Sequence, residues 1–471
     1  MSLPVFSGKQ TEVLYLPATG HLVVLGAAGS GKTTLAIHRA NHLANDVLNK
    51  GRTLLVTYNR TLTRYLEAIG LQGLMNVDVR TYHHFARGYL NARGKMKQND
   101  IAKPTQRLDL ITKAQLEARD RHPQSRILQR NPGVLADEFE WISRMGIRTA
   151  DEYRVAVRIA RAGVRITSAE RSQVWYSYER YRDLRSEAGF RYDWDEIAVA
   201  VLDELRQDTG DRLYKHVVID EGQDFSPTML QSLVAAVPVD GTVTFFGDTA
   251  QQIYGGRITW RNAGLVVDAA RIHRFQENYR NTQQIAAFAT ALAGGPYIQG
   301  TLDMVPPRAP KASGSPPSVI QFTGEADERQ YIVEMAARLG KSRRVAILLR
   351  DRISHESYYL DSLGKTGVKT QRLHGDMREW DGSPLVWVGT YHAAKGLEFD
   401  AVLLPHLNDG AIPNPERIEM LGDPHDVCRE DAKLLYVAAT RARVDLVLTY
   451  SGERTRLLDG IDEKSFRFLV L

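Results

Sequence analysis

The sequence predicts an α/β protein built around a phosphate-binding loop, because a glycine-rich turn separates a buried strand from a helix. The turn follows the apolar run 21–25 and precedes the helical run 34–43, and it reads Gly26-Ala27-Ala28-Gly29-Ser30-Gly31-Lys32-Thr33. Further apolar runs at 215–219 and 242–246 supply two more strands. Strands that alternate with helices indicate a parallel sheet with helices packed on its faces.

The glycine-rich turn has the chemistry of a nucleotide phosphate site. It fits the pattern G-x-x-x-x-G-K-[ST], in which the glycines allow backbone N–H groups to surround an anion. The helix that follows adds the positive end of its dipole. Lys32 would reach the β- and γ-phosphates, and Thr33 would bind Mg²⁺. The alternative is a chance glycine-rich turn, which the strand before it and the helix after it disfavour.

Two adjacent acids end the strand at 215–219. The first, Asp220, stands where a carboxylate can hold Mg²⁺, and the second, Glu221, where one can polarise the attacking water. A solvated loop explains the two acids equally well when they are considered alone. Combined with an upstream phosphate loop in an alternating chain, they favour the catalytic interpretation.

Composition bounds the class of protein. A chain of 471 residues predicts more than one domain, and a net charge of +5 with a pI near 9 is a mild indication of a polyanionic partner. Its single cysteine, Cys428, excludes internal disulfides, a cysteine zinc cluster and an iron–sulfur cluster on this chain. No segment approaches 18 apolar residues, so we expect a cytoplasmic protein without a signal peptide or membrane span.

Segments spread over residues 8–443 together carry a family resemblance. In chain order they are Gly8-Lys9-Gln10, the glycine-rich turn, Val56-Thr57-Tyr58-Asn59, Thr81-Tyr82-His83, Asp220-Glu221-Gly222-Gln223-Asp224, Gly247-Asp248-Thr249-Ala250-Gln251-Gln252-Ile253-Tyr254, Asn278-Tyr279-Arg280, His392-Ala393-Ala394-Lys395-Gly396-Leu397-Glu398-Phe399 and Thr440-Arg441-Ala442. With this order of motifs, the chain resembles the UvrD/Rep/PcrA-type helicases of superfamily 1.

The resemblance implies a fold of two RecA-like P-loop NTPase lobes, with a helical insertion in the first lobe and ATP in the cleft between the lobes. Lobe 1 would comprise 1–88 and 208–280, the insertion 89–207, and lobe 2 residues 281–471. The helical periodicity of 107–206 agrees with such an insertion. Its aromatic stripe is more typical of a core than of a base-stacking platform; the stripe is Val174, Trp175, Tyr178, Tyr181 and Leu184.

One departure from the family is large. Longer members carry a second helical insertion, the 2B subdomain, in lobe 2, but here residues 374–384 lead almost directly into an apolar strand at 385–388. In the family that subdomain touches duplex DNA and regulates unwinding. The resemblance therefore implies translocation by this compact form more directly than it implies strong unwinding.

The resemblance assigns roles around ATP. Glu221 would orient or deprotonate water, Gln251 would sense the γ-phosphate, and Arg280 and Arg441 would neutralise charge on the transferred phosphoryl group. Asp220 and Thr33 would hold Mg²⁺. The remaining nucleotide contacts would come from the adenine-reading Gln10, the loop residues Gly26, Ala27, Ala28, Gly29, Ser30, Gly31, Lys32 and Thr34, the adenine-stacking Tyr279 and the ribose-binding Glu398.

The nucleic-acid track would cross both lobes. By resemblance, single-stranded DNA would meet Tyr58, Asn59, Thr81, His83, Tyr254, Arg257 and His392. Aromatic side chains suit a translocase because every base presents a π-face. One stacking platform differs from the family, since Gly256 and Arg257 stand where Trp-Arg is common and Trp260 comes later.

A basic stripe in the predicted insertion is a separate candidate for a phosphate contact. Its arginines recur at spacings of four, three and four, which would place them on one helical face; they are Arg154, Arg158, Arg161 and Arg165. A solvated basic face remains the favoured alternative to a contact with backbone phosphates.

The sequence thus predicts an ATP- and Mg²⁺-dependent helicase or translocase that moves 3′ to 5′ on single-stranded or tailed duplex DNA. Two alternatives stay open. The first is a DNA-gated ATPase subunit that senses DNA ends or loads a separate nuclease or repair factor, and the second is an RNA-directed motor. Unwinding by the isolated chain and a comparison of DNA with RNA distinguish these hypotheses.

Overall fold

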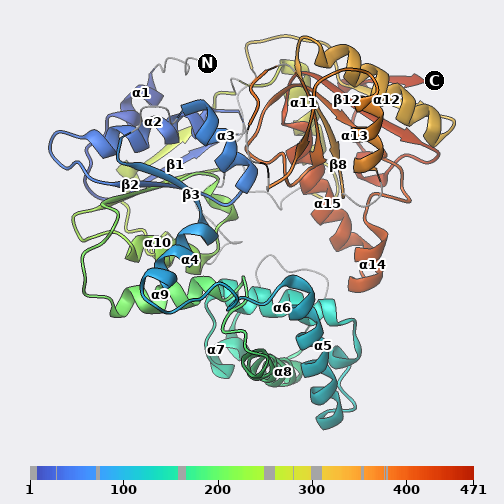
Figure 1. Ribbon diagram of the computed structural model, residues 1–471. Coiled ribbons are helices and arrows are strands. Elements are labelled where there is room, and N and C mark those ends of the chain that lie inside the picture. Colours follow the sequence, from blue (N-terminus) through green and yellow to red (C-terminus); the bar gives the residue numbers. More distant parts are fainter. Residues whose placement is uncertain are drawn as a thin grey trace.

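The computed structural model of the chain contains two parallel sheets and a separate group of helices (Figure 1). It describes residues 8–27, 29–70, 75–157, 166–248, 260–278, 280–298, 310–351, 355–375, 377, 380–383 and 385–471. Among these residues no helix is both long and apolar enough to cross a bilayer.

The first sheet is the centre of lobe 1. Its order is β3-β2-β4-β5-β1-β6, and every pair is parallel. The strands are β1 (Leu22–Gly26), β2 (Thr53–Thr57), β3 (Val77–Thr81), β4 (His216–Ile219), β5 (Thr242–Gly247) and β6 (Ile272–Phe275). Alternate residues of the inner strands enter two different cores, so both faces of this sheet are buried.

Helices cover both faces of the first sheet. Apolar residues of α2 and α3 belong to one of its two cores, whereas α4, α9 and α10 contribute to the other. The helices of this region are α1 (Lys9–Leu14), α2 (Lys32–Asn45), α3 (Arg60–Gly70), α4 (Tyr82–Ala92), α9 (Ile197–Gln207) and α10 (Pro227–Ala235). Parallel strands covered in this way are the arrangement that the alternating sequence predicts.

The insertion is a helical module below the first sheet in Figure 1. It consists of α5 (Pro104–Arg121), α6 (Pro132–Met145), α7 (Ala150–Val155) and α8 (Ser168–Glu187). The aromatic stripe of α8 is buried in the core of this module, with Tyr181 fully buried and Trp175 6% exposed. This confirms that the stripe is a core feature, as the sequence predicts.

The basic stripe does not form the continuous helix that its spacing predicts. The helix α7 ends at Val155, and Ala156 is extended, with φ −60° and ψ 133°. Arg171 stops the helix, because its Nη1 donates to the carbonyl oxygens of Tyr153, Arg154 and Ala156 at 2.8, 2.7 and 2.8 Å.

Of the stripe itself, Arg154 lies in the last turn of α7 and pairs with Asp151 at 2.9 Å. Its other members lie outside the described residues; they are Arg158, Arg161 and Arg165. A helical face shared by all four arginines is therefore wrong as predicted.

The second sheet is the centre of lobe 2. Its order is β13-β7-β12-β11-β8-β10-β9, again parallel throughout. The strands are β7 (Ser318–Phe322), β8 (Arg344–Leu349), β9 (Thr370–Leu373), β10 (Leu385–Thr390), β11 (Phe399–Leu404), β12 (Ala442–Ser451) and β13 (Arg467–Val470).

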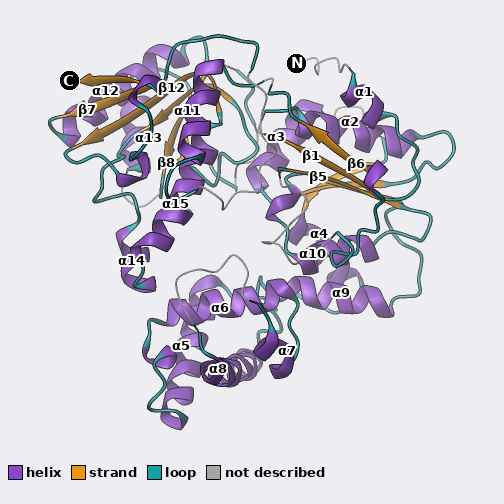
Figure 2. Cartoon of the chain, turned by 180° about the vertical axis from the view of Figure 1, so that it is seen from behind, coloured by secondary structure: helices purple, strands orange, loops and turns teal. Residues whose placement is uncertain are grey.

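In the described part of lobe 2, five helices accompany this sheet. They are α11 (Gln283–Ala293), α12 (Glu325–Gly340), α13 (Glu356–Gly364), α14 (Pro415–Leu421) and α15 (Pro424–Ala439). Figure 2 shows α14 at the end of lobe 2 that faces the insertion. Only residues 374–384 join β9 to β10, so the described part of lobe 2 carries no second helical module at that position.

The helix α9 falls within the expected insertion, 89–207, but it packs with lobe 1. Its apolar residues Ile197, Val201 and Leu205 enter the core that also contains strands β1, β2 and β4. The division into lobe 1, insertion and lobe 2 remains our proposal, and we place the end of the insertion before α9.

Candidate nucleotide site and nucleic-acid track

The glycine-rich turn leaves the carboxyl end of β1 and enters α2. Gly29 and Gly31 have φ of 80° and 81°, values that favour glycine. A Cβ on Gly29 would lie 2.3 Å from Oδ1 of Asn278 and 2.7 Å from Cβ of Arg280. The turn therefore needs glycine both for its backbone and for the close approach of the segment that carries Arg280.

Lys32 is buried, and its ammonium group points back along the turn. Its Nζ donates to the carbonyl oxygens of Gly26 and Ala27 at 2.9 and 2.8 Å, and it forms an ion pair with Asp248 at 2.5 Å. Nearby, Nε2 of Gln10 donates to the carbonyl of Ser30 at 2.9 Å. The first and second motifs of the chain are thus in direct contact, and a phosphate would compete for Lys32 with these oxygens.

Asp220 fits the role of a cation ligand. Its carboxylate is 1% exposed, and neither oxygen makes a hydrogen bond. Burial, and then the adjacent Glu221, raise the pKa of Asp220 to about 7, while Thr33 and Lys32 oppose this shift. A buried carboxylate without partners beside a threonine hydroxyl is a donor set that suits Mg²⁺.

Glu221 follows in a left-handed conformation, with φ 51° and ψ 43°. Such a conformation is uncommon for glutamate and costs about 1–3 kcal/mol, and it is found at functional sites more than elsewhere. Glu221 is half-buried, and Gln223 donates to one of its oxygens.

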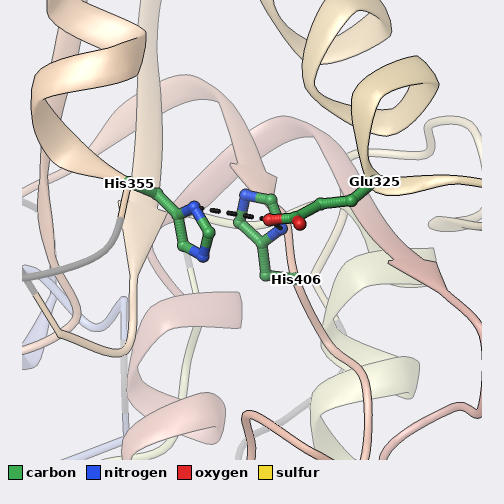
Figure 3. Close-up of side chains that lie close together, drawn as sticks. All are labelled: Glu325, His355 and His406. Carbon is green, nitrogen blue, oxygen red and sulfur yellow. Dashed lines mark ion pairs between the residues drawn. The ribbon is translucent and has the colours of Figure 1, made fainter.

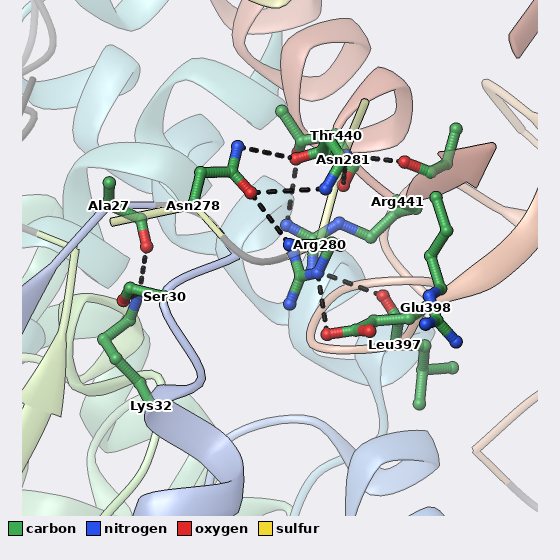
Figure 4. Close-up of polar contacts among 12 residues, drawn as sticks. Ala27, Ser30, Lys32, Asn278, Arg280, Asn281, Leu397, Glu398, Thr440 and Arg441 are labelled. Atoms are coloured by element: carbon green, nitrogen blue, oxygen red, sulfur yellow. Dashed lines mark hydrogen bonds and ion pairs between the residues drawn. The ribbon is translucent and has the colours of Figure 1, made fainter. Parts of the chain in front are cut away.

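Arg280 reaches the site from the segment between the two lobes (Figure 4). Its Nε donates to Oε1 of Glu398 at 2.7 Å, and its backbone N–H donates to Oδ1 of Asn278 at 3.0 Å. Burial alone would raise the pKa of Glu398, but Arg280 lowers it, so the carboxylate is held in its charged form. The arginine and the glutamate that the sequence assigns to different parts of ATP are therefore bonded to each other.

Arg441 lies beside this pair, between α15 and β12. It is 5% exposed, and its guanidinium donates to the carbonyls of Val437 and Leu397 at 2.9 and 3.5 Å. Burial, and then the charge of Arg280, lower the pKa of Arg441 to about 10, whereas Glu221 raises it. Arg280 and Arg441 are thus two buried guanidinium groups close to each other, with Glu398 beside them and Lys32 opposite (Figure 4).

Several predicted site residues lie outside the described residues. They are Ala28, Gln251, Tyr254, Arg257 and Tyr279. Gly26, Gly29, Ser30, Gly31, Thr33 and Thr34 are all placed at the turn or in the first residues of α2.

Tyr58 and His83 form the start of a surface that matches the expected nucleic-acid track. Their ring centroids are 5.7 Å apart, and Tyr58 is 37% exposed. Burial lowers the pKa of His83 to about 4, so this imidazole is neutral at pH 7. A neutral ring contacts a strand by stacking or hydrogen bonding rather than by charge.

Trp194 extends this surface, and the sequence reasoning missed it. Its ring lies 5.3 Å from His83 in an edge-on arrangement, and the guanidinium of Arg87 lies 5.8 Å from its centroid. Trp194 stands just after Asp193 in the loop that precedes α9, far from His83 in sequence. Only the folded chain brings these three rings together, so no local sequence pattern indicates that Trp194 joins Tyr58 and His83.

Of three other described residues expected on the track, two are engaged in structural hydrogen bonds and one is exposed. The hydroxyl of Thr81 accepts from the backbone N–H of His84 at 3.3 Å and so caps α4. The amide of Asn59 donates to the carbonyl of Lys395 at 2.9 Å. His392, by contrast, is exposed in the same segment of lobe 2. Thr81 and Asn59 therefore hold structure in place, and Tyr58, His83 and His392 are the members that remain free for a strand to meet.

Comparison with known families decides the assignment. Residues 7–279 match the UvrD/REP helicase N-terminal domain, and residues 369–453 match the UvrD-like helicase C-terminal domain. The first match alone covers more than half of the chain. The chain belongs to the UvrD/REP helicase family. Its two parallel sheets correspond to the two RecA-like lobes of that family.

Individual relatives agree with the family. The chain is 25% identical to ATP-dependent DNA helicase UvrD2 of Mycobacterium bovis over 574 aligned positions, which cover 96% of this chain and 80% of the relative. It is 39% identical to ATP-dependent DNA helicase Rep of Buchnera aphidicola over 80 residues, 17% of this chain and 12% of that one. A crystal structure of the C-terminal domain of a possible DNA helicase from Lactobacillus plantarum covers 40% of this chain and 98% of its own, with 21% identity and a TM-score of 0.30.

In this member of the UvrD/REP family, an ion pair of Lys395 with Asp224 joins the two lobes. Nζ of Lys395 is paired with a carboxylate oxygen of Asp224, and both groups are half-buried. Burial disfavours the ammonium charge, but Asp224 raises the pKa of Lys395. The backbone carbonyl of Asp224 also accepts from Nη2 of Arg144 at 3.3 Å, so lobe 1, lobe 2 and the insertion meet at one residue.

A second polar cluster lies at the carboxyl edge of the second sheet (Figure 3). It combines Glu325 with His355 and His406, whose rings are stacked with centroids 3.8 Å apart and planes 17° apart. These are ligand types of a divalent metal, but Arg329 already donates to Glu325 and to Nδ1 of His355, the latter at 3.2 Å. The stacked rings and the hydrogen bonds from Arg329 indicate that these side chains bond to one another and do not form an open metal site.

Proposed function

We propose that this chain is an ATP- and Mg²⁺-dependent DNA motor that moves 3′ to 5′ along a single strand. The observation that carries the proposal is the convergence of Lys32, Asp220 and Glu221 from lobe 1 with Arg280 and Arg441 from the lobe 2 side. Phosphoryl transfer needs acidic groups for the cation and the attacking water, and basic groups for the charge on the phosphoryl group. When the two lobes supply these groups separately, the reaction depends on their approach.

The residues present fit Mg²⁺ and ATP. Thr33 and Asp220 would hold the cation, which supplies charge neutralisation at the phosphates when bound. Gln10 would read the adenine edge, since its amide already lies against the glycine-rich turn. Glu398 would accept hydrogen bonds from the ribose hydroxyls, and its hydrogen bond with Arg280 would weaken as a result.

Glu221 would accept the proton of the attacking water. Lys32, Arg280 and Arg441 would stabilise the negative charge that develops on the transferred group. The γ-phosphate would hold the two arginines and Lys32 together, because all three cations would bind the same anion. When hydrolysis removes this phosphate, the cations would repel one another and the lobes would separate. Repeated closing and opening of the cleft would move the track residues of the two lobes relative to each other.

The strand would cross the lobes on the surface formed by Tyr58, His83 and His392. Stacking on aromatic rings gives grip without choice of sequence, which a motor on arbitrary DNA needs. The two relatives reported above are named ATP-dependent DNA helicases, which supports DNA as the polymer.

The proposal is tested by the ATPase rate with single-stranded, tailed and blunt duplex DNA, followed by strand displacement. We expect stimulation by single-stranded DNA and more displacement from a 3′ tail than from a 5′ tail. Stimulation by blunt ends alone, without displacement, would favour the DNA-gated subunit. Stronger stimulation by RNA than by DNA of the same sequence would favour an RNA-directed motor.

A further inference from the structure

The helix α6 connects two parts of the molecule that are far apart in sequence. At its carboxyl end, the carbonyl of Arg144 accepts from Oγ1 of Thr228 in lobe 1 at 3.1 Å. In its amino-terminal half, Oδ2 of Asp137 lies 2.7 Å from Nη2 of Arg417 in α14 of lobe 2. The insertion is therefore attached to lobe 1 at one end of α6 and to lobe 2 near the other end (Figures 1 and 2).

The attachment to lobe 2 is more than one ion pair. Leu421 and Val427 of lobe 2 are 8% and 0% exposed and belong to the core of the insertion. A Cβ on Gly133 would lie 2.2 Å from Sδ of Met420, so the side chain of Met420 packs directly on the backbone of α6 at this glycine. Burial of apolar side chains from both modules in one core makes this a built interface.

The two attachments leave a segment of α6 opposite the proposed DNA track. Asp137 and Arg144 are seven residues apart, which corresponds to about 10 Å of helix. The ring of Tyr58 lies beside the attachment of α6 to lobe 1, because its centroid is 6.2 Å from that of Phe225, the residue after Asp224. Arg144 of α6 donates to the carbonyl of Asp224 at 3.3 Å. A third contact, the ion pair between Lys395 of lobe 2 and Asp224 of lobe 1, joins the two lobes directly.

We propose that the contact of α14 with α6, which we name the clasp, closes the chain around the single strand. This inference rests on the proposed function. Lobe 1, lobe 2 and the insertion contact each other in pairs, and the strand passes through the opening that they frame. A linear strand enters from its end, whereas a strand without ends enters only when the clasp opens.

A disulfide across the clasp provides the test. In the variant Gly133→Cys/Met420→Cys, the two Cβ atoms would be at most about 4.6 Å apart, because Cγ of the native Met420 lies 3.1 Å from a Cβ at position 133. A disulfide needs about 3.5–4.5 Å between them. The reduced variant is loaded on circular single-stranded DNA or on a linear strand of the same sequence, oxidised, and challenged with concentrated salt.

We expect the oxidised protein to leave the circle at least tenfold more slowly than it leaves the linear strand, and reductant to abolish the difference. Oxidation before DNA is added should prevent binding to the circle and leave binding to the linear strand. The reduced variant and the single variant Met420→Cys are the matched controls. Equal release of the locked protein from both DNAs would show that the strand is not enclosed and would overturn the clasp.

A second variant does not depend on disulfide formation. Arg417→Asp places two carboxylates face to face at the clasp, so we expect loading on circular DNA to become at least threefold faster, with loading on linear DNA unchanged. Arg429→Asp makes the same charge change on α15, where the native arginine pairs with Asp426 at 3.2 Å. Equal effects of both variants would overturn the clasp, and failure of the unmodified protein to bind single strands would overturn the proposed function itself.

Discussion

Arg280 and Glu398 are hydrogen-bonded to each other, with 2.7 Å between Nε and Oε1. A carboxylate that fixes a guanidinium before ATP arrives limits the rotamers of that arginine, so less order must be gained in the transition state. The same carboxylate is the expected ribose ligand. Binding of the sugar and positioning of the arginine are therefore connected through one side chain.

Replacing Arg280 with alanine should lower the maximal DNA-stimulated ATPase rate by about 10³-fold, because charge developing on the phosphoryl group loses a partner. The affinity for ATP should change far less. Steady-state kinetics measure both quantities. Arg274→Ala removes an exposed arginine from β6 and should leave both unchanged. A weaker affinity with an unchanged maximal rate would contradict the assigned role.

The variant Glu221→Gln should bind ATP but turn it over at least 100-fold more slowly, since the amide cannot accept the proton of water. We expect it to remain on single-stranded DNA in the presence of ATP. Nucleotide binding by fluorescence and turnover by phosphate release separate the two effects. Normal turnover by this variant would show that Glu221 is not the general base.

The pair Lys395 and Asp224 should couple the two lobes. Lys395→Met and Asp224→Asn should each reduce stimulation of the ATPase by single-stranded DNA. The double variant should be little worse than either single one, with a coupling energy of about 1–3 kcal/mol in the double-mutant cycle. Strictly additive losses would show that the contact carries no coupling.

Trp194 should contribute to the grip on the strand although no motif contains it. Trp194→Ala should weaken single-stranded DNA binding by about 1–3 kcal/mol, the range for one stacked base. Trp194→Phe should restore most of the affinity, because an aromatic face is retained. Binding titrations at fixed salt test this, and an alanine variant with native affinity would place the ring off the track.

The stacked histidines predict a stability that falls at acid pH. Burial, His406 and Arg329 lower the pKa of His355 from 6.5 to about 4, so the unfolded chain binds more protons between these values. Stability should drop as the pH falls through that window, by about 1–2 kcal/mol after allowance for partial exposure. Thermal unfolding of His355→Asn should show a flatter profile, whereas the exposed His425→Asn should follow the native one. Parallel profiles of His355→Asn and the native chain would contradict the assignment.

The features that the sequence predicts well are local. The glycine-rich turn, the acids that end β4 and the buried stripe of α8 each follow from residues close together in the chain, and each lies where expected. Alternating strands and helices likewise suffice for parallel sheets.

What the sequence could not indicate depends on residues brought together from afar. Arg171 ends α7 by binding its last carbonyls, and no periodicity within 154–165 reveals that competitor. Trp194 meets His83, and Arg417 meets Asp137, only after the modules have packed. Thr81 matches a DNA-contact motif, yet its hydroxyl caps α4, because a helix terminus must satisfy its own N–H groups.

The position of Asp224 has a thermodynamic consequence. Its carboxylate contacts lobe 2 and its carbonyl contacts the insertion, so a ligand that shifts either module would act on this one residue. Two ligands that bias one shared residue obey reciprocal linkage. If ATP changes the affinity for DNA by some factor, DNA must change the affinity for ATP by the same factor, and hydrolysis at one site would then alter the affinity for the polymer at the other.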